Sequence, residues 1–281
     1  MIKILNDAEF QLVKDLIYNL SGLDFNHKNK LRLEYKLKER MQQLGYATFN
    51  EYYSFLNKRS TSSDIEIKEL LDLLTVNETS FFRNKSHFKA LNEHVLPEVI
   101  ESNSGSFMVN PPLSIWSAGC STGQEPYSIL ISSLEHKSFI NSGMSLQIYA
   151  TDISQTSIEI AKDGIYPAKR LHNMPLNILK KYFIEKNGKI EILQEYRKKV
   201  KYMYLNLKKG PFPRNLDIIF CRNVMIYFDD NMRKSVIEKL HRSLKSGGYL
   251  FIGHSESLSN FSDLFEFKIC SGGIVYKKIG V

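Results

Sequence analysis

The sequence has 281 residues, enough for one large domain or two smaller ones. Hydrophobic residues make up 43% and charged residues 24%, a composition typical of folded globular proteins. The chain contains no apolar run of about 18 residues and opens with no secretory leader, so we expect a cytoplasmic protein without direct membrane insertion. Three widely spaced cysteines and seven histidines without ligand spacing argue against a disulfide framework and predict no metal site.

The net charge of +8 originates in one part of the chain. Residues 165–214 contain 13 Lys and Arg against 3 Asp and Glu, an excess larger than that of the whole protein. A basic surface of this size indicates an acidic partner. Charge alone leaves open whether that partner is a protein, a nucleic acid or a membrane surface.

The first 76 residues are predicted to form a small helical domain. Apolar residues recur there at three- and four-residue steps, and glycines end the first two runs. The predicted helices span residues 7–20, 27–44, 48–57 and 63–74. Basic residues at every fourth position line one face of the second helix, at Lys28, Arg32, Lys36 and Arg40.

Residues 77–112 are predicted to connect this domain to the next, with a Ser-, Asn-, Gly- and Pro-rich linker over 102–112. From residue 113 onward, short apolar strands alternate with helices. The strands are predicted at 113–117, 146–151, 217–221 and 249–252, and the helices from 124, over 154–162 and over 229–244. This alternation predicts an α/β domain over 113–281 with a doubly wound, Rossmann-like sheet that binds ligand at the carboxyl ends of its strands.

The basic segment interrupts that alternation and predicts a small antiparallel β subdomain inserted at about 165–214. Two short strands, 182–186 and 189–192, flank Asn187-Gly188, a pair typical of a tight hairpin turn. Residues 199–205 alternate in polarity and are predicted to add a third strand to this subdomain.

The loop after the first α/β strand predicts a nucleoside pocket. Gly119 and Gly123 allow close approach of the backbone to a ligand. Asp152 ends the next strand, where an acidic side chain accepts hydrogen bonds from ribose hydroxyls. The loop lacks a Gly-Lys-Ser/Thr phosphate cradle and departs from Gly-x-Gly-x-x-Gly. A nucleoside without a pyrophosphate, such as S-adenosylmethionine, therefore fits better than a nucleotide triphosphate or dinucleotide.

Four blocks of the sequence resemble one known family. They are Asn-Glu-Thr-Ser-Phe-Phe-Arg at 77–83, Trp-Ser-Ala-Gly-Cys-Ser-Thr-Gly-Gln-Glu-Pro-Tyr-Ser at 116–128, Phe-Cys-Arg-Asn-Val-Met-Ile-Tyr-Phe at 220–228 and Gly-His-Ser-Glu-Ser at 253–257. In this order they resemble the CheR-type chemotaxis receptor methyltransferases, which are protein-glutamate O-methyltransferases. The resemblance covers nearly the whole chain. The sequence departs from it at Gln124, where the family often has Glu, and in a longer linker at 102–112.

The resemblance implies S-adenosylmethionine as cofactor, S-adenosylhomocysteine as product and a set of binding residues at matched positions. Arg83, with Asn77 and Thr79, would hold the amino-acid end of the cofactor, because a guanidinium pairs well with a carboxylate. The other implied contacts are Glu125 near the charged amino-acid end, Asp152 at the ribose, Asn206 and Leu207 at the adenine, and Arg222 and Asn223 at the pocket mouth.

Methyl transfer to a carboxylate requires positioning more than acid–base catalysis. Glutamate has a pKa of about 4.3 and is already ionised at neutral pH, so no strong general base is required. The resemblance and this chemistry point to the same catalytic pair, Arg222 to bind the substrate carboxylate and Tyr227 to donate a hydrogen bond to it.

The implied partners are the acidic cytoplasmic helices of methyl-accepting chemotaxis receptors. The basic face of the second helix would complement them, and the inserted β subdomain would offer an edge to a receptor's C-terminal tail. The expected localisation is therefore cytoplasmic with recruitment to membrane receptor arrays, and a monomer is the expected state. Two alternatives remain open from the residues alone: a nucleic-acid methyltransferase, suggested by the basic segment and its aromatic residues, and a non-catalytic cofactor-binding adaptor.

Overall fold

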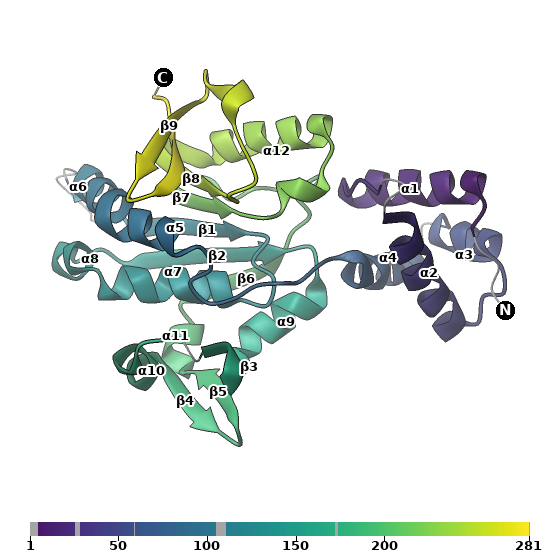
Figure 1. Ribbon diagram of the computed structural model, residues 1–281, viewed down its shortest axis with the longest axis horizontal. Helices are drawn as coiled ribbons and strands as arrows, with labels where there is room; N and C mark the ends of the chain where they lie inside the picture. Colours follow the sequence, from purple (N-terminus) through teal and green to yellow (C-terminus); the bar gives the residue numbers. More distant parts are fainter. Residues whose placement is uncertain (1–4, 26–28, 59, 105–110, 172–173, 281) are drawn as a thin grey trace.

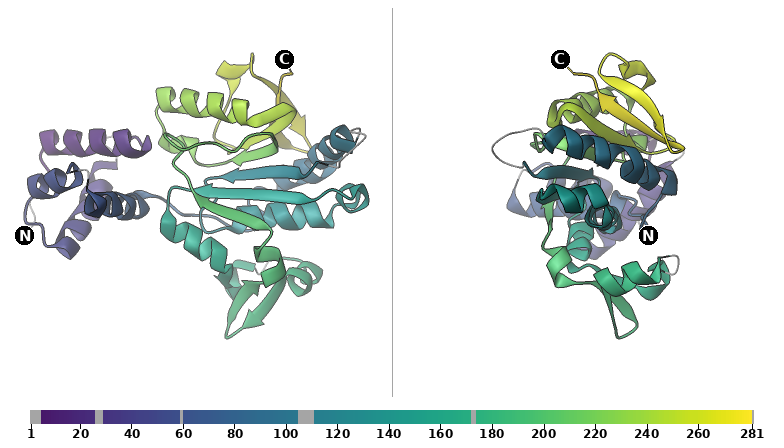
Figure 2. Two further views of the ribbon diagram at one scale, coloured as in Figure 1. Left: turned by 180° about the vertical axis from the view of Figure 1, so that it is seen from behind. Right: turned by 90° about the vertical axis from the view of Figure 1, so that its left-hand side faces the viewer.

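The computed structural model describes residues 5–25, 29–58, 60–104, 111–171 and 174–280. A helical domain lies to one side of a central sheet, and a second, small sheet projects from another side (Figures 1 and 2). The predicted fold class, a doubly wound α/β domain with a helical domain and an inserted antiparallel sheet, is confirmed. Within the described ranges, no helix combines the length and apolar content that a bilayer-spanning segment requires.

Four helices form the helical domain because each buries one apolar stripe against the others. They are α1 (Asp7–Ser21), α2 (Lys30–Leu44), α3 (Phe49–Leu56) and α4 (Thr61–Leu74). Phe10, Val13 and Ile17 are buried from α1, and Leu33 and Leu37 from α2. Helix α2 begins at Lys30 rather than at residue 27, and Lys28 lies outside the described residues.

The central sheet has seven strands in the order β6-β2-β1-β7-β8-β10-β9. In chain order they are β1 (Leu113–Ala118), β2 (Leu146–Asp152), β6 (Val200–Tyr204), β7 (Leu216–Cys221), β8 (Leu244–Ile252), β9 (Phe265–Cys270) and β10 (Gly273–Lys278). The first five pair in parallel, and β9 and β10 form an antiparallel hairpin at one edge. The chain runs outward from β1 through β2 to β6 and then returns to β7 on the other side of β1. The order therefore reverses between β1 and β7, where such sheets bind ligands at the carboxyl ends of the strands.

Alternate residues of the central strands supply two separate cores, because successive strand side chains point to opposite faces. Ile219 and Leu250 pack on one face, which α12 (Asp230–Ser243) covers, and this core continues into the helical domain. Phe220 and Phe251 pack on the other face, with ring centroids 4.3 Å apart. The helices of that second face are α5 (Lys85–Ala90), α6 (Leu96–Ser104), α7 (Gln124–Glu135) and α8 (Lys137–Ser142).

The predicted connecting segment is more structured than its composition suggested. Helix α5 continues through a π-helical turn, Leu91–Val95, into α6. Phe88, Leu91 and Leu96 are buried against the sheet, so this helix belongs to the α/β layer. The part of the predicted linker at 105–110 lies outside the described residues.

The inserted sheet has the order β3-β5-β4, with β3 (Ile165–Pro167), β4 (Phe183–Lys186) and β5 (Lys189–Ile192). Helix α9 (Gln155–Asp163), which packs against β2 and β6 of the central sheet, leads into this small sheet. A 3-10 turn (Ala168–Leu171), α10 (Leu176–Tyr182) and α11 (Gln194–Arg197) lie around it. The predicted hairpin at Asn187-Gly188 is present, with φ of 53° and 70°. The third strand, however, is β3, and the prediction that 199–205 joins this sheet was wrong. Those residues form β6, which pairs in parallel with β2, because alternating polarity identifies a strand but not its partner.

The helical domain contacts the α/β domain at both ends of its interface. The hydroxyl of Tyr18 donates to the carboxylate of Asp229 at 3.0 Å, and Asp72 in α4 accepts hydrogen bonds from the amide and hydroxyl of Thr156 at 3.0 and 2.6 Å. Between these contacts, the loop after α1 lies directly against the loop after β7 through a bridge of Leu23 with Phe228. These contacts place the helical domain over the carboxyl ends of the strands.

Candidate functional site

A cavity of about 200 Å³ lies between the helical domain and the carboxyl ends of β1, β2 and β7. Its helical-domain wall comes from the loop after α1, from α2 and from residues 74–80. Its α/β wall comes from the loops after the three strands and from residues 205 and 207. The cavity therefore coincides with the point at which the strand order reverses.

The loop after β1 brings its backbone close to the loop after β7. A Cβ atom at Gly119, whose φ is +84°, would lie 2.3 Å from Cγ2 of Val224, so only glycine fits this position. Ser121 and Asn223, which border the cavity on either side, also have positive φ values of 49° and 60°. Strained backbone of this kind concentrates at binding sites whose surroundings hold it in place.

Asp152 ends β2 with its carboxylate aimed by backbone donors. One oxygen accepts from the amide of Ser121 at 2.8 Å and the other from the amide of Ser154 at 2.9 Å. Burial raises the pKa of Asp152, and these amide hydrogen bonds oppose that rise. Because a carboxylate has about four acceptor positions, the group retains capacity for ligand hydroxyls. Ser154 caps α9, so Asp152 is not required for that purpose.

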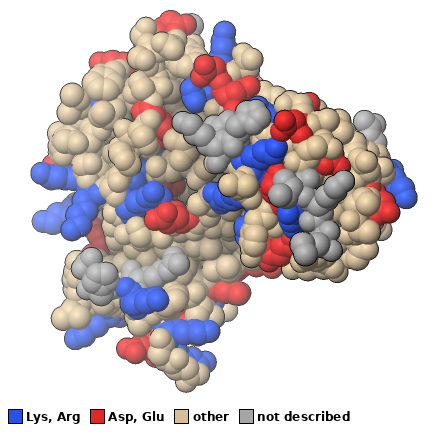
Figure 3. Space-filling model, turned by 45° about the vertical axis from the view of Figure 1, so that its right-hand side comes forward, with Lys and Arg blue, Asp and Glu red and all other residues tan. Residues whose placement is uncertain are grey.

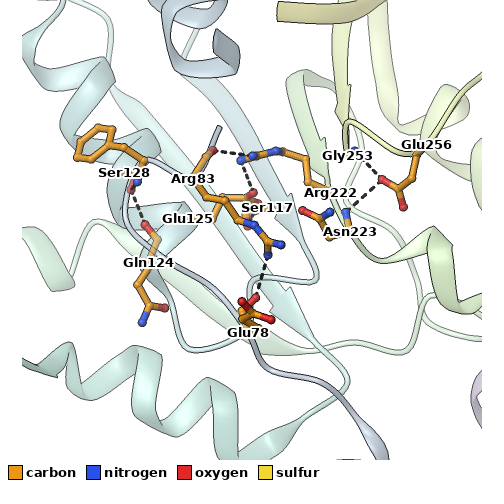
Figure 4. A network of polar contacts seen from close by, with 11 residues as sticks. Glu78, Arg83, Ser117, Gln124, Glu125, Ser128, Arg222, Asn223, Gly253 and Glu256 are labelled. Atoms are coloured by element: carbon orange, nitrogen blue, oxygen red, sulfur yellow. Dashed lines mark hydrogen bonds and ion pairs between the residues drawn. The ribbon is translucent and has the colours of Figure 1, made fainter. Parts of the chain in front are cut away.

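Glu125 lies in the first turn of α7 and contributes a second, largely buried carboxylate. Its Oε1 accepts from the hydroxyl of Ser117 at 2.7 Å, and its Oε2 lies 3.1 Å from Nη1 of Arg222. Burial raises the pKa of Glu125, and the charge of Arg222 opposes this effect. The carboxylate is therefore held at the cavity wall by two partners from neighbouring strands (Figure 4).

Arg222 is buried, and both of its terminal nitrogens are engaged within the protein. Nη2 donates to the backbone carbonyl of Arg83 at 2.6 Å, while Nη1 donates to Glu125 (Figure 4). Burial lowers the pKa of Arg222, and Glu125 opposes that shift. Its Nε has no hydrogen-bond partner among the described residues. Arg222 thus joins the loop after β7 to α7 and to the segment that contains Arg83.

Residues 77–84 cross the cavity with a tightly fixed backbone. Nη1 of Arg83 donates to the carbonyl of Glu78 at 2.9 Å, and the amide of Phe82 donates to the hydroxyl of Ser128 at 2.9 Å. Phe82 and Asn84 have positive φ values of 50° and 64°. Together these contacts present the Arg83 side chain at the cavity wall.

The loop after β7 is held in place by the carboxylate of Glu256, which lies in the loop after β8. The carboxylate of Glu256 accepts from the amides of Gly253 at 2.5 Å, Asn223 at 3.1 Å and Ile226 at 3.1 Å. Tyr227, at the end of this loop, is half-buried against the cavity. Burial raises the pKa of its phenol, so the hydroxyl remains a hydrogen-bond donor at neutral pH.

The structure brings most of the predicted site residues to this one cavity. Those that line it are Asn77, Thr79, Arg83, Glu125, Asp152, Leu207, Arg222, Asn223 and Tyr227. Asn206 does not line it, because its amide donates to the carbonyl of Leu20 at 2.7 Å and its oxygen accepts from the amide of Lys208. Leu205 lines the cavity instead.

The predicted basic face of α2 separates into residues with different environments. Arg32 lines the cavity and is exposed. Lys36 lies 4.0 Å from Glu39, and Arg40 is bonded to Glu66 at 2.5 Å inside the helical domain. Lys28 lies outside the described residues. Sequence reasoning did not identify Arg32 as a cavity residue, since a helix face shows its partner only once the domains are packed.

The donor set of the cavity fits S-adenosylmethionine. Asp152 suits a ribose, Glu125 suits an ammonium and Arg83 suits a carboxylate, and these three groups share one cavity. Leu205 and Leu207 supply an apolar wall. Among the described residues, no group of three or more His, Cys, Asp or Glu could hold a metal ion.

Comparisons with known proteins agree with this arrangement. The model described as the SAM-binding domain of CheR methyltransferases matches residues 77–273, and that of the CheR all-alpha domain matches residues 8–75. A chemotaxis protein methyltransferase of Borreliella burgdorferi is 38% identical over 266 residues, covering 94% of this chain and 92% of that protein. Chemotaxis protein methyltransferase 2 of Vibrio cholerae is 34% identical, covering 94% and 91%, and the Escherichia coli protein is 33% identical, covering 93% and 88%.

These matches confirm the predicted resemblance and the use of S-adenosylmethionine, and they do not favour the nucleic-acid or adaptor alternatives. The two family models meet near residue 76, after the end of α4 and before residues 77–84, which cross the cavity. The protein is an S-adenosylmethionine-dependent methyltransferase, and the chain belongs to the CheR methyltransferase family.

Proposed function

We propose that this enzyme transfers a methyl group from S-adenosylmethionine to glutamate side chains of chemotaxis receptors, forming glutamyl methyl esters in sensory adaptation. The observation that supports this most is a cavity whose lining contains both carboxylates and groups that bind a carboxylate. The loops after β1 and β2 and helix α7 contribute the carboxylates of Asp152 and Glu125, whereas the loop after β7 and helix α2 contribute the phenol of Tyr227 and the guanidinium of Arg32. The first pair suits a nucleoside with an ammonium group, and the second pair suits an incoming carboxylate.

The residues of the site would position rather than activate the substrate. The glutamate carboxylate is ionised at neutral pH, with an ordinary pKa of about 4.3, so no protein group has to remove a proton. When bound, S-adenosylmethionine supplies an electrophilic methyl group. Asp152, Glu125 and Arg83 would fix its nucleoside and amino-acid ends. Tyr227 would donate a hydrogen bond to the substrate carboxylate, and alignment of this kind lowers the barrier by several kcal/mol.

Arg222 is best assigned as a positioning residue in this scheme. Its guanidinium is bonded to Glu125 and to the carbonyl of Arg83, so it orients the two groups proposed to hold the amino-acid end of the cofactor. This role differs from the direct contact with substrate expected from the sequence. A buried pair of this kind is valuable for fixing geometry, whereas its net contribution to stability is small.

Receptor binding would use both accessory parts of the chain. Lys and Arg side chains gather where the helical domain meets the α/β domain (Figure 3), and acidic receptor helices complement such a surface. The inserted sheet has exposed lysines around its free edge strand β4, at Lys180, Lys181, Lys186 and Lys189. That edge would accept a receptor tail as an added strand and raise the local substrate concentration. The enzyme would act as a monomer in the cytoplasm at receptor arrays.

An ester-specific assay tests the proposal. The purified protein is incubated with methyl-labelled S-adenosylmethionine and a receptor cytoplasmic fragment, and methanol released by mild base is counted. We expect base-labile label in the fragment and none in a fragment whose acceptor glutamates are replaced by alanine. Label that enters nucleic acid and not receptor, or no transfer to receptor at all, would overturn the proposal.

A further inference from the structure

Among the described residues, three arginines border the cavity, namely Arg32, Arg83 and Arg222. Arg222 is buried and bonded to Glu125 and to the carbonyl of Arg83, so its terminal nitrogens are already used. Arg83 lies in the segment that crosses the cavity and is assigned to the carboxylate of the cofactor. Only Arg32 therefore remains as a cation for a second carboxylate within the described part of the cavity wall.

Arg32 has the environment that such a role requires. It lies in the first turn of α2, is exposed, and makes no hydrogen bond or ion pair with any residue that the structure describes. Its charge acts on the phenol of Tyr227 from across the domain boundary. Lys36, one helical turn further along α2, does not line the cavity.

The loop after α1 is bonded through its backbone to the loop that contains Tyr227. The amide of Asp24 donates to the carbonyl of Tyr227 at 2.9 Å, and Leu23 pairs with Phe228. Leu23, Asp24 and Arg32 all line the same cavity, so the helical domain forms one wall of the reaction site.

We infer that Arg32 binds the carboxylate of the incoming glutamate opposite Tyr227, so that the helical domain completes the catalytic site instead of serving only as a docking surface. This inference rests on the proposed function. A guanidinium and a phenol occupy some of the acceptor positions of the carboxylate and leave one lone pair for reaction. That oxygen forms the new bond to the methyl carbon, the methyl–sulfur bond breaks with its electron pair retained by sulfur, and no proton is transferred.

The inference separates Arg32 from the rest of the basic face of α2. A residue that only attracts the receptor changes KM, because saturating receptor compensates for weaker docking. A residue that orients the reacting carboxylate changes kcat, because saturation does not restore alignment. Lys36 is the matched control, since it lies on the same helix and outside the cavity.

The experiment compares Arg32→Ala, Arg32→Lys and Lys36→Ala with a receptor cytoplasmic fragment at saturating S-adenosylmethionine. We expect Arg32→Ala to lower kcat by about tenfold or more, which corresponds to loss of one hydrogen bond to a charged group. Arg32→Lys should recover part of that loss, and added methylguanidinium should partly rescue Arg32→Ala. Lys36→Ala should change KM alone.

Affinity for S-adenosylhomocysteine, measured by calorimetry, should be unchanged in all three variants, which verifies that each is folded with an intact cofactor site. An unchanged kcat for Arg32→Ala at saturating receptor, or an effect confined to KM, overturns the inference. If Arg32→Ala does not fold, Arg32→Gln provides the same comparison, and a normal kcat for that variant has the same meaning. Failure of the wild-type protein to methylate receptor would refute the proposed function itself, a result distinct from any difference among variants.

Discussion

The backbone amide of Asp24 donates a hydrogen bond of 2.9 Å to the carbonyl oxygen of Tyr227, so the helical domain is bonded directly to the loop that follows β7. The neighbouring residues, Leu23 and Phe228, continue this contact as an antiparallel bridge. Side chains reinforce it through the 3.0 Å hydrogen bond from Tyr18 to Asp229. A shift of the helical domain would therefore move the loop that contains Tyr227.

Replacement of Tyr227 by phenylalanine tests whether its hydroxyl contacts the substrate. The phenol is a donor at neutral pH, since burial raises its pKa still further above the ordinary value of about 10. We expect Tyr227→Phe to lower kcat by about tenfold to a hundredfold, as one hydrogen bond to a charged group is lost. The backbone bond with Asp24 is retained in this variant, so affinity for S-adenosylhomocysteine should persist. Turnover equal to wild type would remove Tyr227 from the mechanism.

Replacement of Arg83 by alanine tests the cofactor side of the cavity. We expect affinity for S-adenosylhomocysteine to fall by about tenfold to a hundredfold in calorimetry, because a charge-assisted hydrogen bond to its carboxylate is lost. The Arg83 carbonyl that accepts from Arg222 remains in the variant, which limits disturbance of the wall. Arg214→Ala, at a position outside the cavity lining, is the control. Equal affinity of Arg83→Ala and wild type would contradict the assigned role.

Glu256 positions the loop after β7, a role that the sequence did not indicate. The sequence placed Glu256 only within the block at 253–257 that resembles the family. Its carboxylate accepts three backbone hydrogen bonds and spans the loops after β7 and β8, including the amide of Asn223. Glu256→Ala leaves those amides without this acceptor, so we expect kcat to fall and stability to decrease by about 1–3 kcal/mol. Glu256→Gln retains one acceptor oxygen and should recover part of both effects. Glu266→Gln, at an exposed position on β9, serves as the control. If Glu256→Ala changed kcat and stability no more than this control does, Glu256 would not position the loop.

The sequence predicted those features that depend on local pattern. Asp152 ends an apolar strand, and Gly119 occupies the turn after the preceding strand, where a Cβ would meet Val224, so both were found from residue type and position. The partner of β6 and the orientation of Arg32 were not found, because each depends on contacts between segments distant along the chain.

The antiparallel hairpin of β9 and β10 and the side chain of Asn206 show further what the sequence did not predict. The hairpin was not predicted, although Ser271-Gly272 forms its turn with positive φ at both positions. Asn206 matched the family pattern, yet its side chain bonds to Leu20 of the helical domain and to its own loop. A position that matches the family pattern indicates that a residue lies near the site. Tertiary contacts decide whether its side chain faces the cavity.

Arg40 is predicted to stabilise the helical domain, whereas Arg32 on the same helix is predicted to bind substrate. Its guanidinium donates to Glu66 at 2.8 and 2.5 Å, and the hydroxyl of Tyr52 donates to the same carboxylate at 2.6 Å. Glu66 is only 4% exposed, so Arg40→Ala leaves a buried charge without its main partner. We expect a loss of about 3–5 kcal/mol in chemical denaturation. Arg242→Ala, at an exposed position on α12, should change stability by less than about 1 kcal/mol, and a similarly small effect at Arg40 would refute the structural role.

Cofactor affinity should depend on pH through Glu125. Burial raises the pKa of this carboxyl in the free protein, opposed by Arg222, so it is partly protonated at a pH where an exposed glutamate is ionised. The ammonium of S-adenosylhomocysteine favours the ionised form and therefore lowers this pKa on binding. Between the two pKa values, binding must release a proton, so affinity falls as the pH falls, by at most about tenfold per pH unit.

Calorimetry between about pH 5 and 7, in buffers of different ionisation enthalpy, measures this proton release. Glu125→Gln should bind more weakly at neutral pH and lose most of the pH dependence. His87 does not titrate in this window, because burial and the charge of Arg222 lower its pKa to about 4. Asp152 also has a raised pKa, so any residual slope in Glu125→Gln should disappear when Asp152→Asn is added. A wild-type slope that survives in the double variant would show that neither carboxylate couples proton release to cofactor binding.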